Sequence, residues 1–94
     1  MKSPALQCAA ANGHEAVVAQ LLQAKAEIEA RNSYGRTALH WATANGKEAV
    51  VETLLRAKAD PNAVDKYGKT AAQYAVQCGH PALANRLKQA QGSQ

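Results

Sequence analysis

Apolar and polar positions along the chain follow the spacing of amphipathic helices. Residues 47–57, KEAVVETLLRA, place two valines and two leucines on one face of a helix. Residues 38–45, ALHWATAN, predict a shorter helix that Thr37 caps at its start. Gly46 stands between the two segments, and glycine at this place ends a helix in the left-handed conformation. The pattern therefore predicts two helices joined by a turn.

This pattern returns at a fixed step of 33 residues. The letters ANG occur at 11–13 and again at 44–46. Residues 3–32, aligned with residues 36–65, share 16 identities in 30 positions, which chance does not produce at one offset. A third, more divergent copy follows, in which Pro81 opens the second helix. A repeat of this length predicts a helical solenoid, each copy being a turn, a short helix, a turn and a longer helix.

The motif within each copy carries a family resemblance. TALHWA at 37–42 has weaker versions at 4–9, PALQCA, and at 70–75, TAAQYA. In period, order of elements and motif the chain resembles the ankyrin repeat. The resemblance implies an all-α, ankyrin-type helix–turn–helix solenoid of three 33-residue repeats with short β-turn or hairpin connections. It implies a single domain over residues 1–94, divided into repeat 1 at about 3–32, repeat 2 at about 33–65, repeat 3 at about 66–90 and a polar tail at 91–94.

Two lysines and the two ends depart from the family pattern. Lys25 and Lys58 stand where the family usually has glycine after the second helix. A non-glycine residue in the left-handed conformation costs about 1–2 kcal/mol, so these loops are expected to be strained or to close differently. The ends resemble caps, because residues 3–4 open the first helix directly and Lys88 replaces the Leu55 of repeat 2. We therefore expect a complete three-repeat unit with polar outer faces.

Composition narrows the fold class and the setting. Hydrophobic residues make up 47% of the chain, but 22 residues are alanine and none is phenylalanine, which suits closely packed helices rather than a sandwich. The net charge of +4 is modest and mixed in sign, so it does not by itself indicate nucleic acid or a membrane surface. The N-terminus has no apolar leader, and no stretch reaches membrane-spanning length.

Cysteine usage bears on the compartment. With no leader, Cys8 and Cys78 are expected to be reduced thiols in an intracellular protein, cytoplasmic or nuclear. They fall in repeats 1 and 3, so two helix layers of about 8–10 Å each separate them. A disulfide needs Cα atoms within about 7 Å, which excludes this pairing. We expect Cys8 in the core and Cys78 partly exposed.

The triplet Gly68-Lys69-Thr70 resembles the end of a phosphate-binding loop. Such a loop needs a glycine five residues before the Gly-Lys pair, and this position is Ala63. The stretch also has a sister, NSYGRT at 32–37, in the preceding copy. A repeated element is explained as a turn, so we expect no nucleotide binding.

No group of residues indicates catalysis or a metal centre. His40 lies in the family motif and resembles a structural histidine that ties turns together through hydrogen bonds. His14 and His80 lie two repeats apart and cannot share a metal. The acidic residues scatter over second helices and loops, and Glu48 and Glu52 are expected on a solvated helix face. The sequence predicts no enzyme, no cofactor, no metal site and no small-molecule substrate.

The resemblance implies that a partner lies along the turn tips and the exposed side of the first helices. The sequence supports this independently, because the turn glycine and the capping threonine recur unchanged while Ser33 becomes Lys66 and Ala44 becomes Gln77. Architecture explains the positions that recur and leaves the others free for a partner. The expected binding residues are Ser33, Tyr34, Arg36, Trp41, Ala44, Asn45, Lys66, Tyr67, Lys69, Tyr74 and Gln77.

Several interpretations stay open at this point. Trp41 and Tyr74 could pack between repeats, and Tyr34 and Tyr67 could pack on neighbouring turns. The predicted function is a monomeric, non-enzymatic protein–protein interaction module that presents turn tips and first-helix faces as a concave binding surface. A regulatory subunit that blocks its partner's site fits equally well. The alternative is binding of nucleic acid or an acidic partner through the basic turn tips Arg31, Arg36, Lys66 and Lys69.

Overall fold

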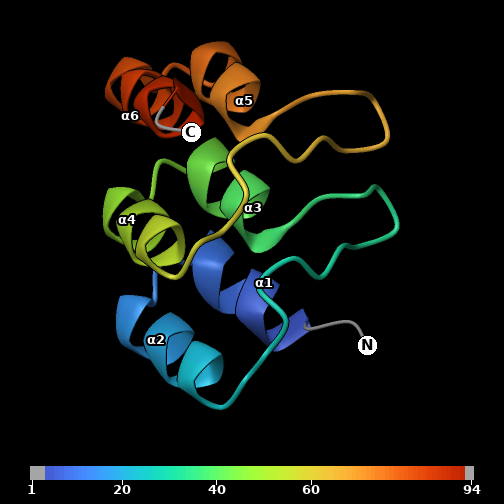
Figure 1. Ribbon diagram of the computed structural model, residues 1–94, viewed down its shortest axis with the longest axis vertical. Coiled ribbons are helices and arrows are strands. Elements are labelled where there is room, and N and C mark those ends of the chain that lie inside the picture. Colours follow the sequence, from blue (N-terminus) through green and yellow to red (C-terminus); the bar gives the residue numbers. More distant parts are fainter. Residues whose placement is uncertain (1–3, 93–94) are drawn as a thin grey trace.

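The computed structural model describes residues 4–92, which fold into six helices with no strands. The helices pair within each repeat, and the pairs stack along one axis (Figure 1). First helices lie against first helices, and the second helices of repeats 1 and 2 lie against each other. The elements are α1 (Pro4–Ala11), α2 (Glu15–Gln23), α3 (Ala38–Ala44), α4 (Glu48–Arg56), α5 (Ala71–Gln77) and α6 (Pro81–Gly92).

Local sequence accounts for where the first helices begin and end. Thr70 caps α5, since its side chain accepts a hydrogen bond from the backbone N–H of Gln73 at 3.3 Å. The Gln73 side chain in turn accepts from the backbone N–H of Thr70 at 2.9 Å. At the end of α3, Gly46 has φ +69° and its N–H bonds the carbonyl of Thr43 at 3.0 Å. The predicted caps and the glycine stops are confirmed.

Two lysines hold the left-handed conformation after the second helices. Lys25 has φ +68° and Lys58 has φ +70°. The N–H of Lys58 bonds the carbonyl of Leu55 at 3.0 Å, and the next N–H, of Ala59, bonds Leu54 at 2.9 Å. These loops therefore close in the usual glycine geometry with a lysine in the strained position.

We expect Lys58→Gly to raise the free energy of unfolding by up to about 1 kcal/mol. Glycine removes the left-handed penalty and gives back part of the gain through its greater freedom in the unfolded chain. The neighbouring Ala57, at φ −83°, provides the control. Ala57→Gly should destabilise by about 0.5–1 kcal/mol, because no strain is relieved there. Urea unfolding of both variants measures the difference, and a destabilised Lys58→Gly would contradict it.

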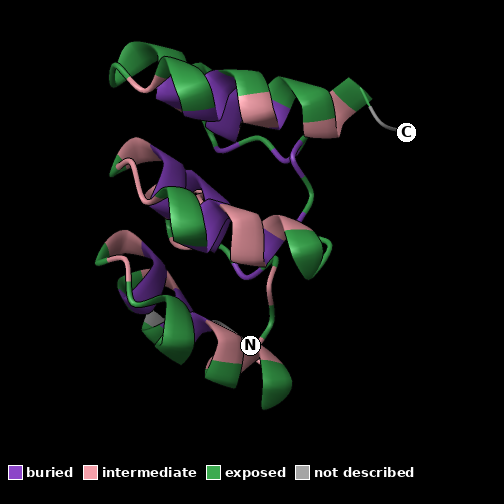
Figure 2. Cartoon of the chain, turned by 90° about the vertical axis from the view of Figure 1, so that its left-hand side faces the viewer, coloured by how far each residue is buried: buried purple, intermediate pink, exposed green. Residues whose placement is uncertain are grey.

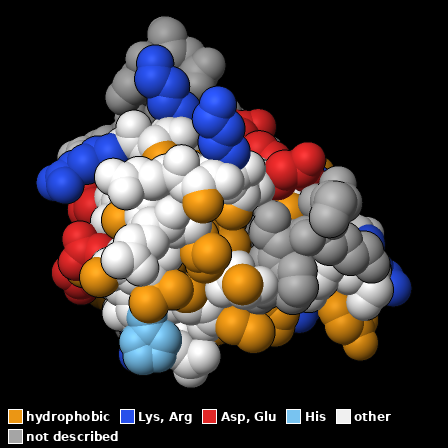
Figure 3. All heavy atoms as spheres, turned by 90° about the horizontal axis from the view of Figure 1, so that it is seen from below, with side chains coloured by type: hydrophobic (Ala, Val, Ile, Leu, Met, Phe, Trp, Pro, Cys, Tyr) orange, Lys and Arg blue, Asp and Glu red, His pale blue; other side chains and the backbone are white. Residues whose placement is uncertain are grey.

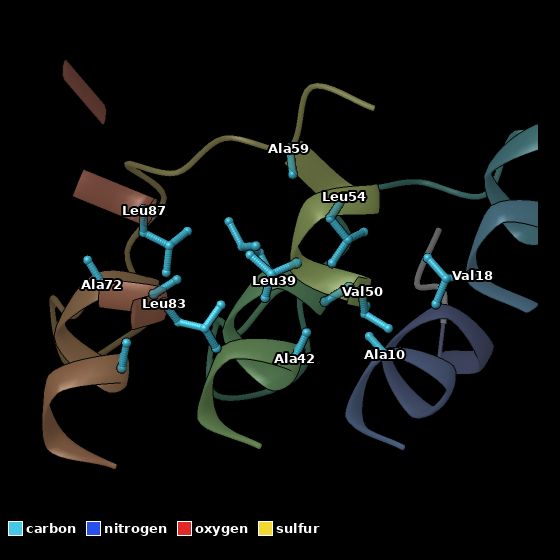
Figure 4. Packing of buried hydrophobic residues seen from close by; sticks show 14 of the residues in the cluster. Ala10, Val18, Leu39, Ala42, Val50, Leu54, Ala59, Ala72, Leu83 and Leu87 are labelled. Atoms are coloured by element: carbon cyan, nitrogen blue, oxygen red, sulfur yellow. The ribbon is translucent and has the colours of Figure 1, made fainter. Parts of the chain in front are cut away.

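The core runs along the stack between the two helix layers. Leu39 on α3 and Leu54 on α4 are almost fully buried, with Leu87 on α6 continuing the same cluster (Figure 4). Buried residues lie on the helix faces turned toward neighbouring repeats, and exposed residues line the outside (Figure 2). Alanines such as Ala42 and Ala75 are fully buried between first helices, which lets these helices approach closely.

The connections between repeats carry two projecting turn tips, the first at residues 32–36 and the second at residues 65–69 (Figure 1). Each is closed like a hairpin by a backbone hydrogen bond between its end residues, at 3.1 Å in the first tip and 3.0 Å in the second. The N–H of Lys66 then bonds the carbonyl of Tyr34 at 2.9 Å. Because this bond joins one tip to the next, the tips form one continuous edge.

The ends of the stack differ from the expected polar caps. Val17 on α2 is 43% exposed, whereas its equivalent in repeat 2, Val50, is 1% exposed. Apolar side chains gather on this end of the molecule (Figure 3). At the other end α6 continues through Gly92, so the polar tail predicted for residues 91–94 does not begin at 91. The Gln91 side chain donates to the carbonyl of Pro61 at 3.1 Å, which fastens this last turn to the preceding loop.

Two further predictions about side chains need correction. Cys8 is exposed rather than part of the core, and it lines a hollow beside Trp41. Cys78 is exposed as well, and both thiols are free. Glu52 is not simply solvated, since it accepts two hydrogen bonds from Arg86, at 2.5 and 3.1 Å, which tie α4 to α6.

Candidate functional site

Cations and tyrosine rings alternate along the turn tips. The Arg36 guanidinium lies 5.1 Å from the ring centre of Tyr34, and the Lys66 ammonium lies 5.3 Å from the same ring. Lys66 is also 5.5 Å from the ring of Tyr67. The Lys69 ammonium lies 5.7 Å from the ring centre of Tyr74, which is on α5. We call the exposed edge formed by Tyr34, Arg36, Lys66, Tyr67 and Lys69 the tip surface.

The buried carboxylate of Asp65 supports the tip surface through hydrogen bonds and an ion pair. Asp65 is 5% exposed, and its Oδ1 accepts from the backbone N–H groups of Tyr67 at 2.9 Å and Lys69 at 3.0 Å. Its Oδ2 accepts a hydrogen bond from the Tyr74 hydroxyl and lies 3.6 Å from Arg36 Nε. One side chain therefore shapes the second tip, orients an aromatic ring of α5 and pairs with a cation.

The surroundings of Asp65 shift two pKa values. Burial alone would raise the pKa of Asp65, but hydrogen bonds from Tyr74 and from the Lys69 and Tyr67 N–H groups outweigh it, lowering the pKa from 3.8 to about 2. Burial raises the pKa of Tyr74, and the hydrogen bond that its hydroxyl donates to Asp65 adds to the rise. At neutral pH the pair is therefore a carboxylate with a neutral phenol.

A column of equivalent residues ties the first helices to the tips. His40 is buried, and its Nδ1 accepts from the backbone N–H of Thr37 at 3.1 Å. Its Nε2 lies 3.0 Å from the Lys69 carbonyl, which can only accept, so Nε2 carries the proton of a neutral ring. Burial lowers the pKa of His40, against the bond to Lys69, which raises it. Gln7 makes the matching contact one repeat earlier, to the Arg36 carbonyl at 3.5 Å.

The exposed side of the first helices is hollowed. A cavity of about 160 Å³ lies between α3 and α5, and its wall contains Trp41 of α3 and Tyr74 of α5. A second hollow of about 210 Å³ lies between α1 and α3, so Trp41 forms a wall common to both. The first cavity, which we call the aromatic cavity, is lined by Arg36, His40, Trp41, Ala44, Tyr74, Gln77 and Cys78.

Trp41 has an unpaired donor. Its indole Nε1 is buried and has no hydrogen-bond partner among residues 4–92. A buried donor without a partner costs about 1–3 kcal/mol, and Thr43 Oγ1 in the core is another such group. Arg36 Nε is also buried without a hydrogen bond, at a distance from Asp65 that allows only an ion pair.

The structure brings nine of the eleven predicted binding residues onto the tip surface or the aromatic cavity. The other two belong to neither group. Ser33 is exposed within the first tip, next to Tyr34 in the sequence. Asn45 donates from Nδ2 to the carbonyl of Trp41 at 2.9 Å, as Asn12 does to Cys8 in repeat 1 at 2.9 Å, and so serves the helix end. The nine are Tyr34, Arg36, Trp41, Ala44, Lys66, Tyr67, Lys69, Tyr74 and Gln77.

Residue-by-residue interpretation of the sequence missed three members of this region. The sequence places Asp65 only among the scattered acids, and its replacement of Asn32 at the equivalent position is the one difference that sets it apart. The sequence predicts that His40 ties turns together, which its bond to Lys69 confirms, but the ring also lines the aromatic cavity. Cys78 lines the cavity too, where nothing in the sequence distinguishes it from a helix-end residue.

The Gly68-Lys69-Thr70 triplet is used by the fold. Gly68 has φ +75° in the second tip, the Lys69 backbone bonds Asp65 and His40, and Thr70 caps α5. Within residues 4–92, no three His, Cys, Asp or Glu side chains gather as metal ligands. In the same part of the chain no helix is both long enough and apolar enough to cross a membrane.

Six stacked helices with this repeat define an all-α helical-repeat solenoid. Residues 6–93 match the family of ankyrin repeats, as three copies. The chain therefore belongs to the ankyrin repeat family, as the sequence resemblance implied. No curated protein matches the sequence. Ankyrin repeats are generally protein–protein interaction modules and typically non-enzymatic.

Proposed function

We propose that this chain is a non-enzymatic module that binds another protein across the tip surface and the aromatic cavity. The observation that carries the proposal is the unbroken series of exposed tyrosines and cations leading into that cavity. Tyr34 is 46% exposed and Tyr67 is 57% exposed, although each is already held by a neighbouring cation. Aromatic residues and arginine held in this way are the types that dominate binding energy at interfaces.

Rigidity supplies the mechanism. The two tips are joined by the Lys66–Tyr34 backbone bond, and His40 fastens the second tip to α3. A surface already ordered before docking loses little conformational entropy when a partner binds.

The setting and the assembly state belong to the same proposal. Two exposed free thiols, Cys8 and Cys78, suit a reducing compartment, the cytoplasm or the nucleus. A monomer that docks one partner along its tips is the simplest arrangement of these surfaces. Whether docking also blocks a site on the partner depends on where the partner's own site lies.

The test compares two double variants by affinity for a protein captured by the wild-type chain. Tyr34→Ala with Tyr67→Ala should weaken binding by about 2 kcal/mol, roughly 30-fold, without lowering the unfolding temperature substantially. The control is Glu48→Ala with Asn85→Ala, which alters two exposed residues on second helices. Glu52 is avoided there because of its pairing with Arg86. Loss of binding in the control and not in the tip pair would place the partner on the second helices instead.

A further inference from the structure

Charge is distributed unevenly between the two sides of the molecule. The chain has seven acidic residues, and only Asp65 lies at the tips, where it is buried and fully engaged. Its carboxylate accepts hydrogen bonds from the second tip and from Tyr74 and pairs with Arg36, so it is not presented to solvent. The remaining six lie on second helices or in the segments that follow them, at Glu15, Glu27, Glu29, Glu48, Glu52 and Asp60.

The two tip lysines have no acid of their own to neutralise them. Lys66 and Lys69 make no ion pair with a carboxylate in the part of the chain that the structure describes. Their ammonium groups instead contact tyrosine rings, and Lys69 Nζ donates to Gln77 Oε1 at 3.0 Å. Arg36 is stacked between the rings of Tyr34 and Tyr74, at 5.1 and 5.5 Å. The charges of Lys66 and Lys69 are therefore uncompensated, Arg36 is already paired with Asp65, and aromatic rings hold all three cations in place.

The aromatic cavity opens beside these cations. Arg36 belongs to its wall and to the tip surface, and Gln77, the partner of Lys69, lines it as well. A cavity of about 160 Å³ with mostly apolar walls holds one small ring or one branched aliphatic side chain. An apolar anchor seated there would have its neighbours in sequence next to Arg36 and Lys69.

We infer that the partner segment is an acidic peptide with one apolar anchor. Resting on the proposed function, this assigns the aromatic cavity to an aromatic or branched aliphatic side chain of the partner. It assigns Lys66 and Lys69 to carboxylates of the flanking aspartates or glutamates. Attraction between the acidic peptide and the tip lysines speeds association, and the same lysines repel basic peptides. This repulsion makes the surface specific for acidic partners. A nucleic acid would use the cations without needing a cavity for an apolar side chain.

The experiment is a selection from a random peptide library displayed on phage, with the wild-type chain as bait. Enriched peptides should carry several Asp or Glu residues around one aromatic or branched aliphatic residue. Synthetic copies of them should bind at least about tenfold more weakly to Lys66→Gln with Lys69→Gln, a variant that keeps the backbone contacts of both positions. Trp41→Ala should reduce binding of the same peptides, and replacing each acid by its amide should do so too. Wild-type affinity should fall as salt is raised from about 50 to 200 mM.

Other results would overturn the inference. Enriched peptides that are neutral or basic, yet lose binding in the Tyr34→Ala with Tyr67→Ala variant, would refute the acidic chemistry and leave the proposed function standing. Peptides that bind that variant as well as the wild type would count against both. A thymidine oligonucleotide that binds more tightly than the best peptide, and loses binding with the two lysines, would favour nucleic acid. A selection that enriches nothing also contradicts the inference.

Discussion

Replacing His40 by alanine is expected to lower the free energy of unfolding by about 3 kcal/mol, the cost of a buried polar side chain that bridges two elements. The ring is 2% exposed and accepts from the Thr37 N–H at the start of α3. It also donates to the Lys69 carbonyl in the second tip. Alanine leaves a void and two unpaired backbone groups, and for a domain of this size the unfolding temperature should fall by about 15 °C. Urea and thermal unfolding measure both quantities.

The repeat supplies the control for this prediction. Gln73 is the residue equivalent to His40 in repeat 3, where it is exposed and only caps α5. Gln73→Ala should therefore cost no more than about 1 kcal/mol. His40→Gln should recover part of the loss, because glutamine at position 7 makes the corresponding cross-turn bond. Equal losses for His40→Ala and Gln73→Ala would mean that the bond to the second tip contributes little to stability.

The same histidine gives a pH dependence with a definite sign. Burial lowers the pKa of His40 in the folded chain, so the unfolded state binds more protons below the ordinary value of about 6.5. Its contribution to stability is complete above that pH and is lost as the pH falls through the lowered folded pKa. His40→Gln should remove this part of the pH dependence.

The repeat period and its motif were enough to predict most of the architecture. Helix positions, the threonine caps and the glycine stops follow from local sequence, because the same residue types recur at equivalent positions of the repeats. Pro81 at the start of α6 is another such case. Some of the errors fall at the ends of the stack. Val17 at the N-terminal end has a neighbouring repeat on one side only, so the burial of its equivalent in repeat 2, Val50, does not transfer to it.

The candidate site was predictable only in part, for a different physical reason. Exposed tip residues could be inferred because architecture does not require them. The aromatic cavity could not, since its wall combines α3, α5 and a tip, and its shape depends on how closely the helices pack. Asp65 needed a three-dimensional view as well. At position 32 an asparagine shapes the first tip with the same two backbone bonds, and only the contact with Tyr74 and Arg36 shows why a charge stands at 65.

This contrast between positions 32 and 65 makes a second large effect measurable. Asp65→Ala is expected to lower the free energy of unfolding by about 3 kcal/mol, because the groups that bind the buried carboxylate would be left without a partner. The N–H groups of Tyr67 and Lys69 would lose their acceptor, and Arg36 would lose its counter-charge. Asp65→Asn keeps an oxygen for both N–H groups, as Asn32 does in the first tip. It should therefore cost only about 1–2 kcal/mol.

Acid titration separates the charge of Asp65 from its shape. The pKa of Asp65 is lowered from 3.8 to about 2 in the folded chain, so its contribution is complete above about pH 4 and is lost as the pH falls toward 2. A shift of this size corresponds to about 2 kcal/mol. Urea unfolding of the wild type between these pH values should show that loss, and Asp65→Asn should not. Glu48→Gln, which alters an exposed carboxyl on α4, should keep the wild-type slope. If Asp65→Asn and Glu48→Gln lose stability with acid in the same way as the wild type, the buried carboxylate does not hold the second tip.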